Sequence, residues 1–328
     1  MYILKNKDKF FSEEDFLKFL DGFFEQREGL ILGRGDDCAI IKTENEMLIS
    51  SDLFLEGYHF DMKYFPPYAI GYKALAVNIS DILAMGGIPV GFTMSIMINK
   101  KIATKRFFKE FFKGISLLCK KYNIYLAGGD ISFSKFFGID ITIFGKKGER
   151  CLFRKKANPG DLIFITGDIG LSRTGLYAFK KGLQERFKVA TMSHLMPKIF
   201  YNESRAITKN PFVTSLMDVS DGVLKDIKRL MPKEMGANLE IDGSMLHPEV
   251  ISMAEILGED PVVFAAKGGE DYVLMGTIAS DGIKRLKDAI PTLKVIGEVI
   301  RNEEFMLNRK KIEGGFDHFE YFFKNTVE

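Results

Sequence analysis

The stretch Gly71-Tyr-Lys-Ala-Leu-Ala-Val-Asn-Ile-Ser-Asp-Ile-Leu-Ala-Met-Gly86 is apolar on almost every side and yet contains a carboxylate, Asp81. Pro66-Pro67 before it and Gly86-Gly87 after it predict a helix that ends near Met85. Asn78 and Asp81 are three residues apart, so they share one face of this helix. A carboxylate on so apolar a helix must be paired, bound to a metal or wrongly assigned to a helix.

Four more short stretches outside this helix end in one or two aspartates set among glycines or hydroxyls. In all four the aspartate lies at or just after the C-terminal end of a predicted strand, where ligand sites of α/β sheets form. Carboxylates gathered by one fold repel each other and raise each other's pKa. The pattern therefore predicts a single acidic site for hard divalent cations, which prefer oxygen ligands. The stretches are Gly33-Arg-Gly-Asp-Asp37, Ser50-Ser-Asp52, Gly128-Gly-Asp130 and Asp218-Val-Ser-Asp-Gly222.

Strand and helix patterns alternate along the rest of the chain. They predict an α/β (α+β) fold of two domains, 1–149 and 150–328, each with a mixed sheet and flanking helices. The charged segment 145–150 is the predicted crossing between the domains. Predicted strands include 47–50, 92–98, 124–127, 139–144, 161–166 and 215–217, and predicted helices include 104–122, a segment from 172, and 221–231 with Ser220 as its cap.

Composition excludes several classes of protein. The 328 residues suit two domains, and 46 Lys and Arg against 44 Asp and Glu leave a net charge of only +2. No strong field therefore favours a nucleic-acid or membrane partner. The sequence has no apolar run of the ~20 residues that a membrane span needs, and no signal-peptide pattern at its start. Three unevenly spaced cysteines favour a reducing compartment, so we expect a cytoplasmic protein.

Each motif also has a purely structural interpretation. Gly33–Asp37 has the composition of a turn, and Ser220-Asp221 that of a helix cap. Backbone amides of the turn 167–175 could hold an anion, although a tight turn is the simpler interpretation. The sequence lacks a Walker A loop, so any bound nucleotide would need metal to hold its phosphates.

Taken in order, these stretches resemble the thiamine-monophosphate kinase family over nearly the whole chain. Further matching blocks are Pro159-Gly-Asp161, Gly268-Gly-Glu-Asp-Tyr272 and Gly315-Phe-Asp-His-Phe319. The resemblance implies the two-domain fold of the aminoimidazole-ribonucleotide-synthetase-like (PurM-like) superfamily and a homodimer formed through the N-terminal half. It also implies transfer of the γ-phosphoryl group of ATP to thiamine monophosphate, with several Mg²⁺ ions.

The resemblance assigns roles to individual residues of this sequence. No single residue acts as a general base, and the metal-held Asp81 and Asp130 are central to catalysis. His59, Glu270 and Phe316 would contact thiamine monophosphate, although His59 and Phe316 could also be ordinary packing residues. The ATP contacts would be Gly129, Asp130, Arg154 and Ser220, and the magnesium ligands would be Asp36, Ser50, Ser51, Asp52, Asp81, Asp130, Asp218 and Asp221.

The sequence departs from the family pattern at three places. Ser51 stands where threonine is common, and Ile131-Ser132 stands where Thr-Thr is common. The Arg-Pro-rich segment is reduced to Met196-Pro-Lys198, which puts a phosphate contact there in doubt.

Two alternative functions stay open from the sequence. A selenophosphate-synthetase-like enzyme of the same superfamily would need a reactive thiol, for which Cys38 is the candidate. A non-catalytic calcium-binding protein would hold its ion with the same aspartates, but these are dispersed rather than spaced as in an EF-hand.

Overall fold

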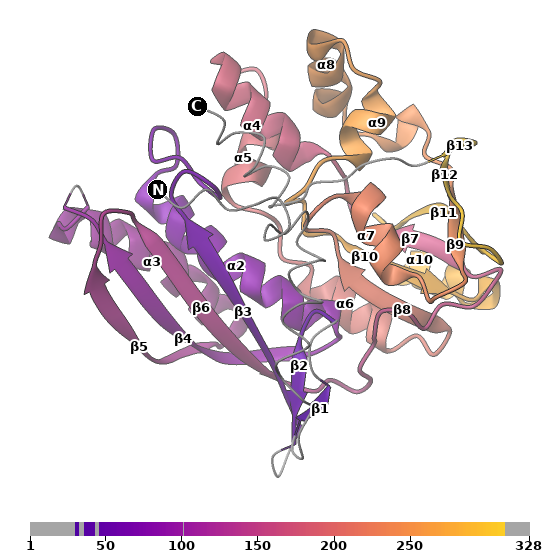
Figure 1. Cartoon of the computed structure of the whole chain (residues 1–328), viewed down its shortest axis with the longest axis horizontal. Coiled ribbons are helices and arrows are strands. Elements are labelled where there is room, and N and C mark those ends of the chain that lie inside the picture. The colour runs from indigo at the N-terminus through magenta and orange to yellow at the C-terminus, as the bar shows by residue number, and fades with distance from the viewer. Residues whose placement is uncertain (1–29, 33–35, 43–45, 101, 312–328) are drawn as a thin grey trace, which may run out of the picture.

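The computed structural model of the chain describes residues 30–32, 36–42, 46–100 and 102–311. The N-terminal half forms a six-stranded sheet in the order β1-β2-β3-β6-β4-β5, in which the β4–β5 pair is parallel and the other pairs are antiparallel (Figure 1). Its elements are β1 (Leu30–Leu32), β2 (Ala39–Ile41), β3 (Met47–Leu55), α2 (Pro67–Ala84), β4 (Ile88–Ile98), α3 (Lys105–Tyr122), β5 (Tyr125–Phe133) and β6 (Gly138–Lys146).

The C-terminal half forms a seven-stranded sheet in the order β13-β12-β9-β11-β7-β10-β8, with β12 and β9 parallel. Mixed sheets with flanking helices in both halves confirm the predicted fold class. Its elements are β7 (Leu162–Ile165), α4 (Leu171–Lys181), α5 (Lys188–Leu195), α6 (Tyr201–Thr208), β8 (Val213–Asp218), α7 (Val223–Leu230), β9 (Gly236–Leu239), α8 (Pro248–Leu257), α9 (Pro261–Ala266), β10 (Leu274–Ile278), α10 (Ile283–Ala289), β11 (Lys294–Ile300), β12 (Phe305–Leu307) and β13 (Lys310–Lys311).

Helix α2 is the element that joins the two halves. Pro67 occupies its first turn, where the missing N–H costs nothing, and most of its residues are buried. One side of α2 covers the six-stranded sheet beside α3, and another side contacts β8 and α6 of the C-terminal half. Burial from both directions explains why this helix is apolar all round.

Strand lengths differ from the sequence predictions at two aspartates. β3 continues through Asp52 to Leu55, and β5 runs from Tyr125 to Phe133, so Asp52 and Asp130 lie within strands rather than at their ends. The ladder between β3 and β6 pairs every residue from Met47 to Leu55, and this pairing carries the strand past its polar residues. The prediction that the polar residues at 50–52 end the strand is therefore wrong.

The predicted cap of α7 was also wrong. The helix begins at Val223 with Gly222 as its N-cap residue, and no side chain caps it. The backbone carbonyl of Ser220 instead accepts a hydrogen bond from the amide of Glu270.

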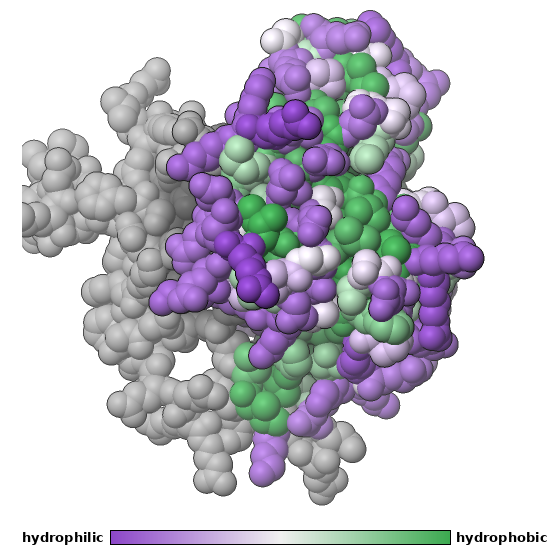
Figure 2. Space-filling view, turned by 90° about the vertical axis from the view of Figure 1, so that its right-hand side faces the viewer, coloured by the Kyte–Doolittle hydropathy of each residue, from purple (hydrophilic) through white to green (hydrophobic). Residues whose placement is uncertain are grey.

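Each half has its own cluster of buried apolar side chains. On the face of the C-terminal half that Figure 2 presents, hydrophilic side chains dominate the periphery and apolar ones gather nearer the middle. No helix in the described part of the chain is long and apolar enough to cross a membrane.

Candidate functional site

Asp81 lies on the side of α2 that meets both β3 and the C-terminal half. Ser50 Oγ of β3 donates a hydrogen bond of 2.5 Å to Asp81 Oδ2. Asp52, on the same face of β3, shares a hydrogen bond with the Asp81 carboxyl. One residue earlier on α2, Ser80 Oγ donates to Asp218 Oδ2 at 2.6 Å. Neighbouring positions of a single helix therefore reach acidic groups of both halves.

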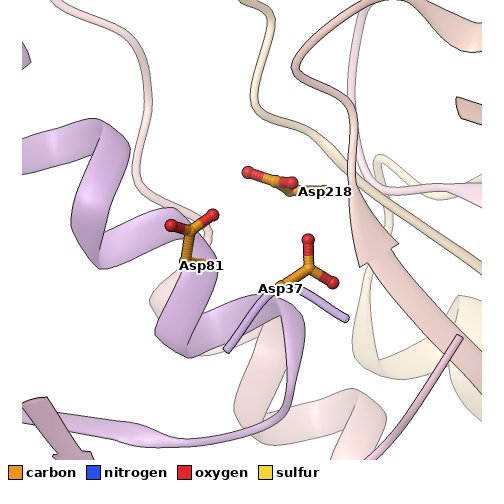
Figure 3. A group of neighbouring side chains, drawn as sticks. All are labelled: Asp37, Asp81 and Asp218. Atoms are coloured by element: carbon orange, nitrogen blue, oxygen red, sulfur yellow. The ribbon is translucent and has the colours of Figure 1, made fainter. Parts of the chain in front are cut away.

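Asp37, Asp81 and Asp218 form a cluster whose ligand oxygens lie within 4.8 Å of one another. Figure 3 shows Asp81 on α2, Asp218 at the end of β8 and Asp37 on the segment before β2, with their carboxyl groups around a common space. Asp37 and Asp218 are buried. Three oxygen donors from three separate elements suit a hard divalent cation such as Mg²⁺.

Burial and mutual repulsion raise the pKa of these acids. Burial, followed by Asp52, Asp218 and Asp37, raises the pKa of Asp81 well above its ordinary value. Burial and then Asp37 also raise the pKa of Asp218. Without a cation the cluster therefore favours bound protons, and a divalent ion would replace them.

Arg154 contacts this cluster through its guanidinium group. Its Nε donates to Asp37 Oδ2 at 3.1 Å, and its Nη2 donates to the other oxygen. The backbone amide of Arg154 donates to Asp36 Oδ2 at 3.1 Å. Asp36, which the resemblance named as a metal ligand, thus lies beside the cluster, while its neighbour Asp37 faces the shared space. Two adjacent aspartates in a turn give no sequence signal for which one points inward.

Residues 35–146 match the family described as AIR synthase related protein, N-terminal domain, and residues 158–308 match its C-terminal domain. A thiamine-monophosphate kinase of Buchnera aphidicola is 33% identical over 327 residues, which cover 92% of this chain and 97% of that relative. The chain belongs to the thiamine-monophosphate kinase family.

Two further comparisons agree with this membership. The thiamine-monophosphate kinase of Aquifex aeolicus is 32% identical over 292 residues, covering 87% of this chain and 92% of that enzyme. A structure described as AaThiL complexed with AMPPCP and TMP superimposes with a TM-score of 0.84 at 27% identity. The superposition covers 97% of this chain and all of that one, so the PurM-like two-domain fold is confirmed.

Among the magnesium ligands that the kinase family implies, the structure separates Ser51 and Asp130 from the cluster. Side chains alternate along a strand, so Ser51 faces away from Ser50 and Asp52, and its Oγ lies 3.0 Å from Thr142 Oγ1. Asp130 and its neighbour Gly129 lie on β5, three strands from β3, or roughly 14 Å at the usual strand spacing.

Asp221 and Ser220 come from the loop after β8. Asp221 Oδ2 accepts from Arg229 at 2.6 Å and forms an ion pair with Lys225 at 3.0 Å. The carbonyl of Ser220 accepts from Glu270 N at 2.7 Å, so the Asp218 and Glu270 stretches of the kinase pattern run side by side. A Cβ at Gly269 would lie 2.7 Å from the same carbonyl, which is why glycine occupies that position.

The expected substrate contacts have different surroundings. Glu270 Oε2 pairs with Lys73 of α2 at 3.1 Å. His59 lies in the turn after β3, where its Nδ1 accepts from the Leu55 amide at 3.0 Å and its ring stacks on Phe54. Phe316 lies outside the described residues.

Two features that the sequence left open now have an explanation. The amides of Gly170 and Ser172 donate to the carboxylate of Asp271 at 2.6 and 2.9 Å, so the protein itself fills the anion-binding turn. Lys198, in the reduced Arg-Pro segment, pairs with Glu203 at 2.8 Å.

Cys38, the candidate thiol of the selenophosphate-synthetase-like alternative, is buried. Burial and then the surrounding aspartates raise its pKa well above the ordinary value. A reactive cysteine needs a lowered pKa and an exposed sulfur, and Cys38 has neither.

The sequence analysis placed Asp37 in an acidic stretch without singling it out as a ligand, and it missed Lys73, Ser80 and His194. The sequence does contain a signal for Lys73. This lysine lies in the same apolar stretch as Asp81, and a charged group that is buried there needs a partner.

Proposed function

We propose that the protein phosphorylates thiamine monophosphate to thiamine diphosphate, with ATP as phosphoryl donor and Mg²⁺ as cofactor, by direct in-line transfer. The observation that carries this proposal is the cluster of Asp37, Asp81 and Asp218 between the two halves of a member of this kinase family. The similar structure that contains AMPPCP and TMP supports both substrates.

The chemistry of the acceptor explains why the site needs charge neutralisation more than a base. A phosphate monoester has a second pKa near 6, so its attacking oxygen is largely deprotonated at neutral pH. The acceptor must approach the polyanionic tail of ATP, and each unit-charge pair at 4 Å repels by roughly 4 kcal/mol at an effective dielectric of 20. Positioning and neutralisation are the main contributions of a protein to phosphoryl transfer.

Asp37, Asp81 and Asp218 would hold the metal, with Asp36 and Asp52 beside them. When bound, Mg²⁺ supplies positive charge between the two phosphates. Asp81 and Asp218 belong to different halves, so the site exists only while the two halves keep their relative position. Arg154, already at Asp37, would contact ATP.

The position of Asp130 supports a homodimer. Asp130 pairs in register with Ser95 of β4 and lies on the sheet face opposite to α2, roughly 14 Å from Asp52. Exposed apolar residues on that face and along the β5 edge would be covered by a second copy. The partner's Asp130 would then take the role that the resemblance assigns. The exposed residues are Leu53, Tyr125, Leu126, Ile131 and Phe133.

We further propose a cytoplasmic location and a domain boundary between residues 149 and 150. The three cysteines are free thiols in the structure, which supports a reducing compartment. The boundary falls between the two matched family segments.

The direct test is incubation with ATP, Mg²⁺ and thiamine monophosphate, followed by fluorescence detection of thiamine diphosphate. Thiamine, pyridoxal phosphate and aminoimidazole precursors serve as alternative acceptors. We expect product from thiamine monophosphate alone, and only with Mg²⁺. Absence of thiamine diphosphate at saturating substrates would refute the proposal.

A further inference from the structure

Lys73 is a fully buried lysine that has no role in the proposed reaction. Its side chain is 0% exposed. Its Nζ donates to the His194 carbonyl at 2.8 Å and to Glu270 Oε2 at 3.1 Å, and lies 5.4 Å from the centre of the Phe65 ring. A buried ammonium group is stable only when it is paired, so Lys73 depends on Glu270.

Glu270 is held in an unusual conformation on the other side of this pair. Its φ of +63° lies in the left-handed region, which non-glycine residues rarely adopt. Its amide donates to the Ser220 carbonyl, and Tyr272, also at positive φ, donates to Val219. Such strain persists where the surrounding structure fixes it, and it is typical of binding sites.

The two carboxylate oxygens of Glu270 have different surroundings. Oε2 faces Lys73, whereas 30% of the side chain remains exposed. Among the described residues, Oε1 has no hydrogen-bond partner. Lys73 therefore fixes Oε2 inside the protein, whereas the described residues leave Oε1 able to accept a further hydrogen bond.

His194 lies beside both members of the Lys73–Glu270 pair. Its Nδ1 lies 3.1 Å from Ser172 Oγ and 3.8 Å from Glu270 Oε2, and its ring packs edge-on against Phe65. Burial, and then Lys73 and Lys180, lower its pKa well below the ordinary value. Both effects disfavour the charged imidazole, and Lys73 supplies the positive charge opposite Glu270.

Helix α2 sets the distance between this pair and the acidic cluster. Lys73 and Ser80 are seven residues apart, so they share a face and lie about 10 Å apart along the helix axis. Ser80 binds Asp218, whereas Lys73 binds Glu270. Helix α2 therefore sets the spacing between Asp218, a member of the acidic cluster, and the carboxylate of Glu270. A substrate with a phosphate at one end and organic rings at the other needs two such binding groups at a fixed separation.

We propose that Lys73 is a positioning residue for the acceptor substrate. It holds the Glu270 carboxylate with Oε2 turned inward, so that Oε1 accepts a hydrogen bond from an amino group at the organic end of thiamine monophosphate. This inference rests on the proposed function. Lys73 cancels the charge of Glu270, so the pair does not add to the repulsion of the substrate phosphate. The pair recognises the substrate through the geometry of the hydrogen bond that Glu270 accepts.

The test is Lys73→Met, with Lys113→Met as the matched control. Lys113 forms an exposed pair with Glu110 on α3. Loss of one charge-assisted contact should raise the KM for thiamine monophosphate by about 10-fold, or about 1.4 kcal/mol, and leave the KM for ATP within about twofold. The control should change neither. An unchanged KM for thiamine monophosphate, or an equal rise of both KM values, would overturn the inference.

The double variant separates positioning from folding. Glu270→Gln alone leaves a fully buried ammonium without a counter-charge, so its Tm should fall further than that of Lys73→Met. Lys73→Met/Glu270→Gln should recover the Tm and keep the raised KM for thiamine monophosphate. If the double variant recovered both the wild-type Tm and the wild-type KM for thiamine monophosphate, a positioning role for Lys73 would be contradicted.

If Lys73→Met does not fold, Lys73→Arg keeps the charge but displaces Glu270, and it should still raise the same KM. A wild-type protein that forms no thiamine diphosphate would refute the proposed function, whereas an active wild type with an unaffected Lys73→Met would refute this inference alone.

Discussion

Arg154 and Asp37 show how single side chains prepare the acidic site. The guanidinium of Arg154 occupies both oxygens of Asp37, while Asp36 accepts hydrogen bonds from the backbone amides of Arg154 and Asp37. Burial and then Asp37 raise the pKa of Asp36 to about 6. The two neighbouring aspartates therefore have different tasks: Asp37 faces the shared space, and Asp36 fixes the backbone around it.

The first prediction distinguishes these two aspartates. Asp37→Asn should abolish most of the rise in Tm that Mg²⁺ with a non-hydrolysable ATP analogue produces, because it removes a cluster oxygen with its charge. Asp36→Asn should retain most of that rise. A ligand that binds only the folded state at 100 times its Kd stabilises by ~2.7 kcal/mol, which is measurable as a thermal shift. Equal loss in both variants would contradict the assignment of Asp37 as the inward-facing residue.

The second prediction concerns pH and His194, which faces Lys73, Lys180, Glu270 and Tyr64. Its pKa is lowered in the folded state, so the unfolded chain binds a proton that the native protein does not. The resulting stability is present above the ordinary histidine pKa of about 6.5 and is lost as pH falls below it, by up to ~1.4 kcal/mol per pH unit.

Urea unfolding of the wild type and of His194→Gln at pH 7.5, 6.5 and 5.5 measures this contribution. The variant should lose less stability than the wild type between pH 6.5 and 5.5. Parallel curves would mean that His194 does not titrate as inferred.

At the scale of elements, helix α2 aligns the two halves. Ser80 and Lys73 reach the C-terminal half through Asp218 and Glu270, and the carbonyl of Leu83 accepts from Ser204 of α6. On its other side α2 packs closely on α3. A Cβ at Gly114 would lie 2.0 Å from the Tyr68 carbonyl oxygen, so the approach of the two helices requires glycine there.

The third prediction is that Gly114→Ala destabilises the protein. Alanine favours a helix by up to ~1 kcal/mol over glycine, but overpacking costs typically ~1–3 kcal/mol, and the clash here is with backbone. We expect a net loss of about 1–2 kcal/mol in urea unfolding. Gly243→Ala is the control, because no atom lies within 4 Å of a Cβ at that position. A stabilised Gly114→Ala would mean that α3 can shift freely away from α2.

At the scale of the whole molecule, the six-stranded sheet separates the acidic residues onto two faces. Asp52 faces α2 and the cluster, whereas Ser51 and Asp130 face the opposite side. β5 is exposed along its whole length and bears apolar side chains that a monomer would leave in water. A homodimer through this surface would bury them and bring together residues from two chains.

The fourth prediction tests that arrangement by complementation. Asp81→Asn and Asp130→Asn should each reduce kcat by about 100-fold or more, or ~2.7 kcal/mol. If the partner's Asp130 completes each site, mixed dimers of the two variants contain one intact site and should recover a substantial part of the wild-type rate. Mixed dimers that stay as inactive as the parents would place Asp130 and Asp81 in the same chain's site.

Much of the architecture was predictable from periodicity. The apolar stretch 71–86 with its flanking prolines and glycines predicted α2, and Thr104 with the following pattern predicted α3, whose first turn Thr104 caps. Membership of the thiamine-monophosphate kinase family, inferred from ordered motifs, is confirmed by relatives that match nearly end to end. Longer β3 and β5 were missed because strand pairing, rather than local preference, extends them.

The sequence by itself determined that acidic side chains recur in both halves and that α2 carries one of them in an apolar setting. Only the tertiary structure decided that Asp37 joins Asp81 and Asp218, that Ser50 rather than Ser51 faces them, and that Lys73 pairs with Glu270. The physical reason is that periodicity fixes which residues share a face within one element. Which faces of distant elements meet depends on loop closure, strand register and packing, and these arise only when the whole chain folds.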